Sequence, residues 1–140
     1  MHYLDTSVLV AYYCPEPLSK AAQRAIRRAR APTISPLVEV ELCSAVAAKV
    51  RTGELDKAAG TQIIATFQQH VAEGLYQVVP IAAAEYALAR NWLGQFATAL
   101  RALDSLHLAA AFNNGLTVLT ADKALARAGK RLGVKCRLLG

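Results

Sequence analysis

Two acidic residues follow short apolar segments that are typical of strands. Asp5 comes directly after His2 to Leu4, and Asp122 comes shortly after Leu116 to Leu119. In open parallel sheets, ligands bind outside the carboxyl ends of the strands, where the strand order reverses. Asp5 and Asp122 are therefore candidates for a shared site. The alternative is that each one caps a turn or a helix through nearby backbone N–H groups.

Two further acids lie on the apolar sides of predicted helices. Glu41 shares a helical stripe with Val38 and Ala45, and Asp104 shares one with Leu108. A buried carboxylate without compensation costs several kcal/mol, so it must be paired, neutral or bound to a metal. Both acids are therefore candidates for the same site as Asp5 and Asp122.

Ordinary structural roles compete with this interpretation of the Asp104 helix. Arg101, three residues before Asp104, is close enough on a helix to form an ion pair with it. His107, three residues after Asp104, is more simply interpreted as a hydrogen-bonded packing residue than as a ligand. Asp104 alone therefore does not establish a site.

Together, the four carboxylates predict a divalent-cation site. Four acids in one place cannot all ionise without a cation, because each raises the pKa of the next. Hard oxygen ligands of this kind suit Mg²⁺ or Mn²⁺. The chain has 16 Lys and Arg against 10 Asp and Glu, a net charge of +6, so an acidic site would lie in a basic molecule. That combination suits a metal-dependent enzyme acting on a phosphodiester backbone, although a basic composition also fits a merely charged surface.

Short apolar strands alternate with helical stretches along the whole chain. The strands are predicted at 2–4, 33–35, 76–81, 116–119 and 134–138, and the helices at 18–31, 36–51, 54–73, 82–93, 101–113 and 122–132, with Ser35 as an N-cap. This order indicates an α/β fold with a parallel sheet covered on both faces. The length of 140 residues and the absence of repeats or linkers predict a single domain over residues 1–140.

Composition excludes several other classes of protein. Hydrophobic residues make up 54% of the chain and charged residues 19%, which argues against intrinsic disorder. No apolar stretch approaches the roughly 18 residues of a membrane span, and the first residues lack the basic segment of a secretory signal. The three cysteines, Cys14, Cys43 and Cys136, have no metal-ligand spacing. We therefore expect a cytoplasmic protein with no membrane segment.

Four segments resemble the motifs of PIN-domain ribonucleases, in the order found in that family. They are Asp5 to Leu9, Ser35 to Leu42, Leu103 to Ala111 and Leu119 to Leu125. Each motif alone is weak, but the ordered set is specific and spans most of the chain. Within the family, the chain looks like a VapC-type toxin of a toxin–antitoxin system.

This resemblance implies a three-layer α/β/α fold with a central, mainly parallel sheet. It implies a Mg²⁺- or Mn²⁺-dependent endoribonuclease that forms a homodimer and is inhibited by a VapB-type antitoxin. Asp5, Glu41, Asp104 and Asp122 match the acidic catalytic and metal-binding positions. The hydroxyl positions that orient acids or water are matched by Thr6, Ser7 and Thr120.

Two basic helix faces are candidates for guiding RNA, although both could be plain solvated surfaces. One carries Lys20, Arg24, Arg27 and Arg28, and the other carries Lys123, Arg127, Lys130 and Arg131. Three other functions remain open at this stage. They are a catalytically inactive RNA-binding module, a small phosphatase or phospho-acceptor domain that uses Asp5 as nucleophile, and a nuclease that acts on DNA.

Overall fold

The computed structural model describes residues 1–140 and is built on one parallel sheet. Its five strands are β1 (His2–Leu4), β2 (Thr33–Ile34), β3 (Gln77–Val78), β4 (Thr117–Thr120) and β5 (Cys136–Leu138). They lie in the order β3-β2-β1-β4-β5, and every neighbouring pair is parallel. The strand order therefore reverses at β1, with β2 on one side and β4 on the other.

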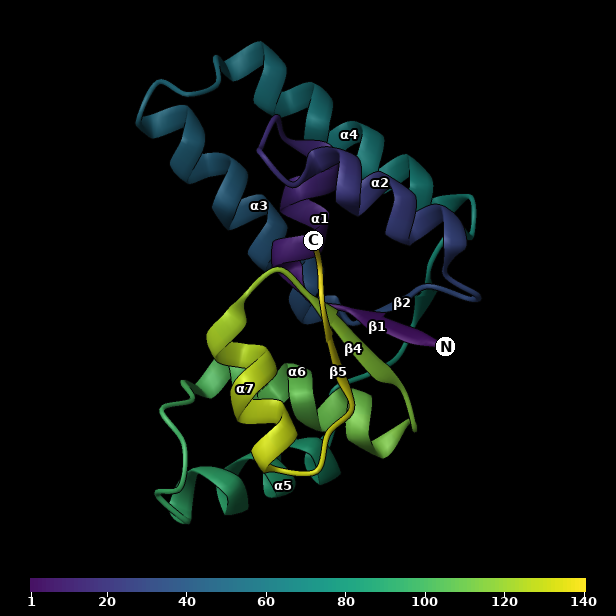
Figure 1. Cartoon of the computed structure of the whole chain (residues 1–140). Helices are drawn as coiled ribbons and strands as arrows, with labels where there is room; N and C mark the ends of the chain where they lie inside the picture. The colour runs from purple at the N-terminus through teal and green to yellow at the C-terminus, as the bar shows by residue number, and fades with distance from the viewer.

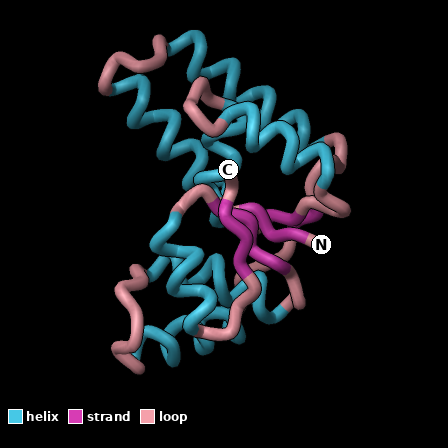
Figure 2. The backbone as a smooth tube through the Cα atoms, viewed as in Figure 1, coloured by secondary structure: helices cyan, strands magenta, loops and turns pink.

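Helices cover both faces of the sheet (Figure 1). One layer holds α1 (Thr6–Tyr13), α2 (Ser19–Arg28), α3 (Pro36–Arg51) and α4 (Lys57–Ala72). The other holds α5 (Ala83–Gly94), α6 (Ala102–Asn113) and α7 (Lys123–Arg131). Figure 2 shows the strands enclosed between these two helical layers. The predicted three-layer α/β/α architecture is confirmed.

The core is a cluster of 27 buried residues that joins the sheet to both layers. Leu9 and Leu42 enter it from α1 and α3, and Leu108 and Leu125 enter it from α6 and α7. The central strands contribute buried apolar residues such as Leu4, Ile34 and Val118 to this core, which is why these short segments could be recognised in the sequence. No helix is long and apolar enough to cross a membrane.

Three local details differ from the predictions. The segment after Asp5 forms helix α1. No helix was predicted there, because the segment is apolar almost throughout and its apolar residues do not repeat with a helical period. Ser35 precedes α3 but makes no side-chain cap, because its hydroxyl bonds to Tyr3 instead. The helix predicted from residue 54 starts at Lys57, where the Asp56 carboxylate accepts the Ala59 N–H at 2.7 Å.

Candidate active site

The carboxyl ends of β1 and β4 place Asp5 beside Thr120. The register pairs Leu4 with Leu119, so the next residues of both strands adjoin at one edge of the sheet. The side chain of Asp5 is buried, with 5% of the residue exposed. Its Oδ1 accepts from the Ser7 hydroxyl at 2.5 Å and from the Val8 N–H at 3.4 Å, which caps α1. Its Oδ2 accepts from the Thr120 hydroxyl at 2.7 Å.

This network ties Asp5 to the turn that carries Asp122. The Ser7 hydroxyl accepts the Ala121 N–H at 2.9 Å, and the Thr120 hydroxyl accepts the Asp122 N–H at 3.0 Å. Burial raises the pKa of Asp5 above its ordinary value, and the hydrogen bonds from Ser7 and Thr120 offset this only in part. Asp5 is therefore both a helix cap and a member of a buried polar network.

Glu41 faces the same region from α3. Its Oε1 accepts from the Thr6 hydroxyl at 2.7 Å and from His107 Nε2. Burial favours the neutral form of Glu41, but the hydrogen bonds from His107 and Thr6 outweigh it and hold the pKa of this carboxyl below its ordinary value. Glu41 is consequently ionised at neutral pH.

A buried chain of hydrogen bonds supports Glu41 from behind. Tyr3 Oη lies 2.7 Å from His107 Nδ1 and 2.7 Å from Ser35 Oγ, and Tyr3 and His107 are both almost fully buried. Because ionised Glu41 can only accept, His107 Nε2 donates to it. The Tyr3 hydroxyl then links His107 Nδ1 to Ser35 Oγ. His107 is a buried, hydrogen-bonded residue, as the sequence predicted, whereas Tyr3 was not among the residues predicted to belong to the site. The available signal was a phenol within an apolar strand, since a buried hydroxyl needs a partner.

Asp104 and Asp122 line one hollow of about 120 Å³ together with Arg101. Asp104 is half-buried in the first turn of α6. Asp122 is exposed and caps α7, where its Oδ1 accepts the N–H groups of Ala124 at 2.9 Å and Leu125 at 3.2 Å. Burial raises the pKa of Asp104, and the nearby carboxylates of Asp122 and Glu41 raise it further.

The predicted alternative of an Asp104–Arg101 ion pair is wrong. The ion pairs of the structure involve Lys49 and His107 only, although the Arg101 charge opposes the rise in the pKa of Asp104. Asp104 thus lies within electrostatic range of both Asp122 and Glu41. Asp5 joins them through its neighbour Thr6, which bonds to Glu41, and through Thr120.

No three Asp, Glu, His or Cys side chains lie close enough together to hold a metal ion as the structure stands. The chemistry of the acids nevertheless fits a divalent cation. A cation among Glu41, Asp104 and Asp122 would relieve the repulsion that raises the pKa of Asp104. Asp5 retains acceptor capacity, because a carboxylate has about four lone-pair sites and three protein donors bond to it.

The two basic helix faces are both exposed. Lys20, Arg24, Arg27 and Arg28 lie on α2, and Lys123, Arg127, Lys130 and Arg131 lie on α7. Arg24 and Arg28 line a hollow with Arg137 of β5, a residue that was not singled out from the sequence. The contribution of Arg137 follows from strand register, which the sequence alone does not supply.

Comparison with known proteins agrees with this fold. The family model for the PIN domain matches residues 2–131. No curated protein sequence matches the chain significantly. The chain therefore belongs to the PIN domain family.

Solved structures share the fold at low sequence identity. FitAcB from Neisseria gonorrhoeae has a TM-score of 0.75 and 22% identity, covering 97% of this chain and 96% of that one. VapC20 from Mycobacterium tuberculosis, described as a sarcin-ricin loop cleaving toxin, has a TM-score of 0.72 and 17% identity over 92% and 95%. VapBC2 from Rickettsia felis, bound to a DNA fragment from its promoter, has a TM-score of 0.71 and 17% identity over 100% of both chains.

Proposed function

We propose that this chain is a divalent-metal-dependent endoribonuclease and the toxin of a VapBC-type toxin–antitoxin pair. The observation that carries the proposal is the electrostatic interaction of Asp104 with Asp122 and Glu41, together with buried Asp5 at the strand end where the strand order reverses. PIN domains are generally nucleases. The similar fold of VapC20, described as a sarcin-ricin loop cleaving toxin, supports RNA as the substrate.

The side chains have separate roles in this mechanism. Asp5, Glu41, Asp104 and Asp122 would hold Mg²⁺ or Mn²⁺, which when bound lowers the pKa of water and neutralises charge on phosphoryl oxygens. Ser7 and Thr120 fix the orientation of the Asp5 carboxylate, and Thr6 and His107 fix that of Glu41. Side chains that are held in place in this way lower the entropic part of the activation barrier for cleavage.

An RNA cleavage assay tests the proposal. Wild-type protein, Asp5→Asn and Asp104→Asn would be compared in Mg²⁺, in Mn²⁺ and in EDTA, with Asp56→Asn, which alters the exposed cap of α4, as the matched control. We expect cleavage by the wild type and the control only, and only with metal. The products should carry 5′-phosphate and 3′-hydroxyl ends, because attack by water does not need the ribose 2′-hydroxyl. Ends with 2′,3′-cyclic phosphate would contradict this mechanism.

Two alternative functions give different results in the same assay. A phospho-acceptor domain would form a phospho-aspartate at Asp5, but both oxygens of this buried carboxylate accept hydrogen bonds from the protein, which argues against that role. An inactive RNA-binding module would bind RNA without metal-dependent turnover. Competition between RNA and DNA of the same sequence separates a ribonuclease from a nuclease that acts on DNA.

The proposal also includes a homodimer and a VapB-type antitoxin partner. The structural similarity to VapBC2 from Rickettsia felis supports the antitoxin partner. Light scattering on the purified chain should give the mass of a dimer. Expression of the chain should inhibit bacterial growth, and co-expression of the small protein encoded beside it should restore growth.

A further inference from the structure

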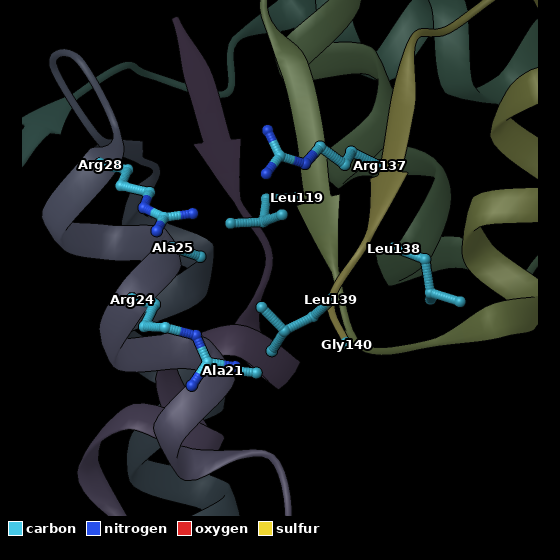
Figure 3. Close-up of a pocket in the computed structure, with 9 residues that line it drawn as sticks. All are labelled: Ala21, Arg24, Ala25, Arg28, Leu119, Arg137, Leu138, Leu139 and Gly140. Atoms are coloured by element: carbon cyan, nitrogen blue, oxygen red, sulfur yellow. The ribbon is translucent and has the colours of Figure 1, made fainter.

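A hollow of about 120 Å³ between α2 and β5 is lined by three arginines. Arg24 and Arg28 come from α2, Arg137 comes from β5, and Leu119 of β4 lies between them. Figure 3 shows Arg28 and Arg137 extending toward the space around Leu119 from opposite sides. We call Arg24, Arg28 and Arg137 together the arginine pocket.

Sheet register and helix periodicity build this pocket. Leu119 pairs with Leu4 on one side and with Arg137 on the other, so these side chains share one face of the sheet. Helix α2 presents the pairs Ala21 and Ala25, and Arg24 and Arg28, each at i and i+4 spacing on one side. The small alanines leave the space that the arginines line.

The charges of the arginine pocket have no acidic partner. All ion pairs of the structure involve Lys49 or His107, so the three guanidinium groups are free to bind an anion. A second, smaller hollow shares Arg28, Arg137 and Leu119 and is also lined by His2. The buried Nδ1 atom of His2 has no hydrogen-bond partner, which leaves an additional polar group unsatisfied at this place.

The arginine pocket is joined directly to the candidate active site through the backbone. The Asp5 N–H donates to the carbonyl of Leu119 at 3.2 Å, and the Leu139 N–H donates to the carbonyl of Thr120 at 2.7 Å. Leu119 and Leu139 line the pocket, whereas Asp5 and Thr120 bond to each other in the acidic site. The arginine pocket and the acidic site therefore involve adjacent residues of β4, Leu119 and Thr120.

We propose that the arginine pocket binds a backbone phosphate of the RNA strand next to the segment held at the acidic site. This proposal rests on the proposed ribonuclease function and names a substrate contact for it. The planar guanidinium group of arginine matches the oxygens of a phosphate in a bidentate manner. An acidic peptide also carries suitable oxygens, but continuity with a site that would act on phosphodiesters favours RNA.

Fluorescence anisotropy with a short fluorescein-labelled single-stranded RNA tests the proposal in EDTA, so that cleavage does not interfere. The variant Arg28→Gln/Arg137→Gln would be compared with Arg51→Gln/Arg90→Gln, which removes two exposed arginines, one at the end of α3 and one on α5. We expect the pocket variant to bind roughly tenfold more weakly and to have a salt slope shallower by about 1. The control should change by less than about twofold, because it loses only distant charge. Thermal unfolding verifies that both variants fold.

Equal weakening by both variants, or no RNA binding by the wild type, would overturn the proposal. Two further measurements test whether the arginine pocket binds a different ligand. Tighter arginine-dependent binding of a labelled polyglutamate peptide than of RNA would assign the pocket to a protein partner. Thermal stabilisation by inorganic phosphate that needs Arg28 and Arg137, with no arginine-dependent RNA binding, would assign it to a small anion. Either result would also overturn the proposal.

The cleavage assay separates this proposal from the proposed function. Metal-dependent cleavage that needs Asp5 but has the same KM in the Arg28→Gln/Arg137→Gln variant overturns the arginine pocket and leaves the ribonuclease intact. Arginine-dependent RNA binding without any acid-dependent cleavage overturns the ribonuclease and supports the pocket.

Discussion

Asp5 combines a structural role with a candidate catalytic one. It caps α1, and burial raises its pKa. Asparagine caps a helix about as well as aspartate but carries no charge. We therefore expect Asp5→Asn to abolish RNA cleavage and to leave the metal-free protein as stable as the wild type or more stable. Chemical denaturation in EDTA measures this difference.

The pH dependence of that difference follows from linkage. Because the pKa of Asp5 is higher in the folded state, wild-type stability falls as pH rises from about 4, the ordinary aspartate pKa, through the folded value. The advantage of Asp5→Asn should grow over the same interval. Asp56→Asn, at the exposed cap of α4, is the control and should show little change. Strong destabilisation by Asp5→Asn would mean that the charge of Asp5 is structural.

Tyr3 is a positioning residue in the series of hydrogen bonds that leads from Ser35 to Glu41. Tyr3→Phe removes the hydroxyl and leaves Ser35 Oγ and His107 Nδ1 without this partner in a buried environment. An unsatisfied buried polar group costs about 1–3 kcal/mol. We expect a loss of stability in that range and a lower kcat with little change in KM. Denaturation and steady-state kinetics measure these effects.

Tyr86→Phe is the matched control for Tyr3→Phe. Tyr86 lies on α5 and is 55% exposed, so loss of its hydroxyl should leave both stability and kcat unchanged. If Tyr3→Phe behaved like this control, the chain from Ser35 to Glu41 would have no role in positioning the carboxylate.

At the scale of elements, Glu85 joins α5 to α6. Its Oε1 accepts the Ala82 N–H at 2.8 Å at the start of α5, and its Oε2 accepts from Asn113 Nδ2 at 2.5 Å at the end of α6. These bonds lower the pKa of Glu85, with the bond from Asn113 as the largest cause. We expect Glu85→Gln to lower the free energy of unfolding by about 1 kcal/mol at neutral pH, as for other helix caps.

The contribution of Glu85 to the free energy of unfolding should disappear at acidic pH. A carboxyl with a lowered folded pKa stabilises the protein above its unfolded pKa and loses this effect as pH falls through the folded value. The difference between wild type and Glu85→Gln should therefore shrink below about pH 4, the ordinary range of glutamate. Glu73→Gln, an exposed position at the end of α4, should show a small difference at every pH. A constant difference for Glu85→Gln would contradict the argument.

Most helices and strands could be predicted from the sequence, because apolar segments marked the central strands and glycines marked the ends of helices. The central strands β1, β2 and β4 are largely buried, whereas β3 and most of β5 are exposed. Gly53, Gly74 and Gly115 adopt positive φ values where helices end. Helix α1 escaped prediction because Thr6 to Tyr13 is mostly apolar and has no amphipathic period. For the same reason, the segment gave no sign that Asp5 begins a helix as well as ending a strand.

At the scale of the whole molecule, the sequence pointed to Asp104 and Asp122, which line one hollow, but not to the side chains that hold the acids in place. Helical stripes pointed to Glu41 and Asp104, and strand ends pointed to Asp5 and Asp122. The support by Tyr3 and His107, and the contribution of Arg137 to the arginine pocket, come from contacts between residues far apart in the chain. Such contacts depend on strand order and register, which one sequence does not specify.

A divalent cation should couple the two helical layers, since Glu41 belongs to one and Asp104 and Asp122 to the other. A ligand that binds only the folded state stabilises it by about 2.7 kcal/mol at a hundred times its Kd. We expect Mn²⁺ to raise the unfolding temperature of the wild type by several degrees, and to do so less in Asp104→Asn, which lacks one carboxylate of the set. Electron paramagnetic resonance of free Mn²⁺ measures binding independently of activity. Asp56→Asn should respond like the wild type, because it alters an exposed cap of α4. An equal response in all three proteins would place any bound Mn²⁺ outside the four acids, and the metal-dependent mechanism would then be wrong.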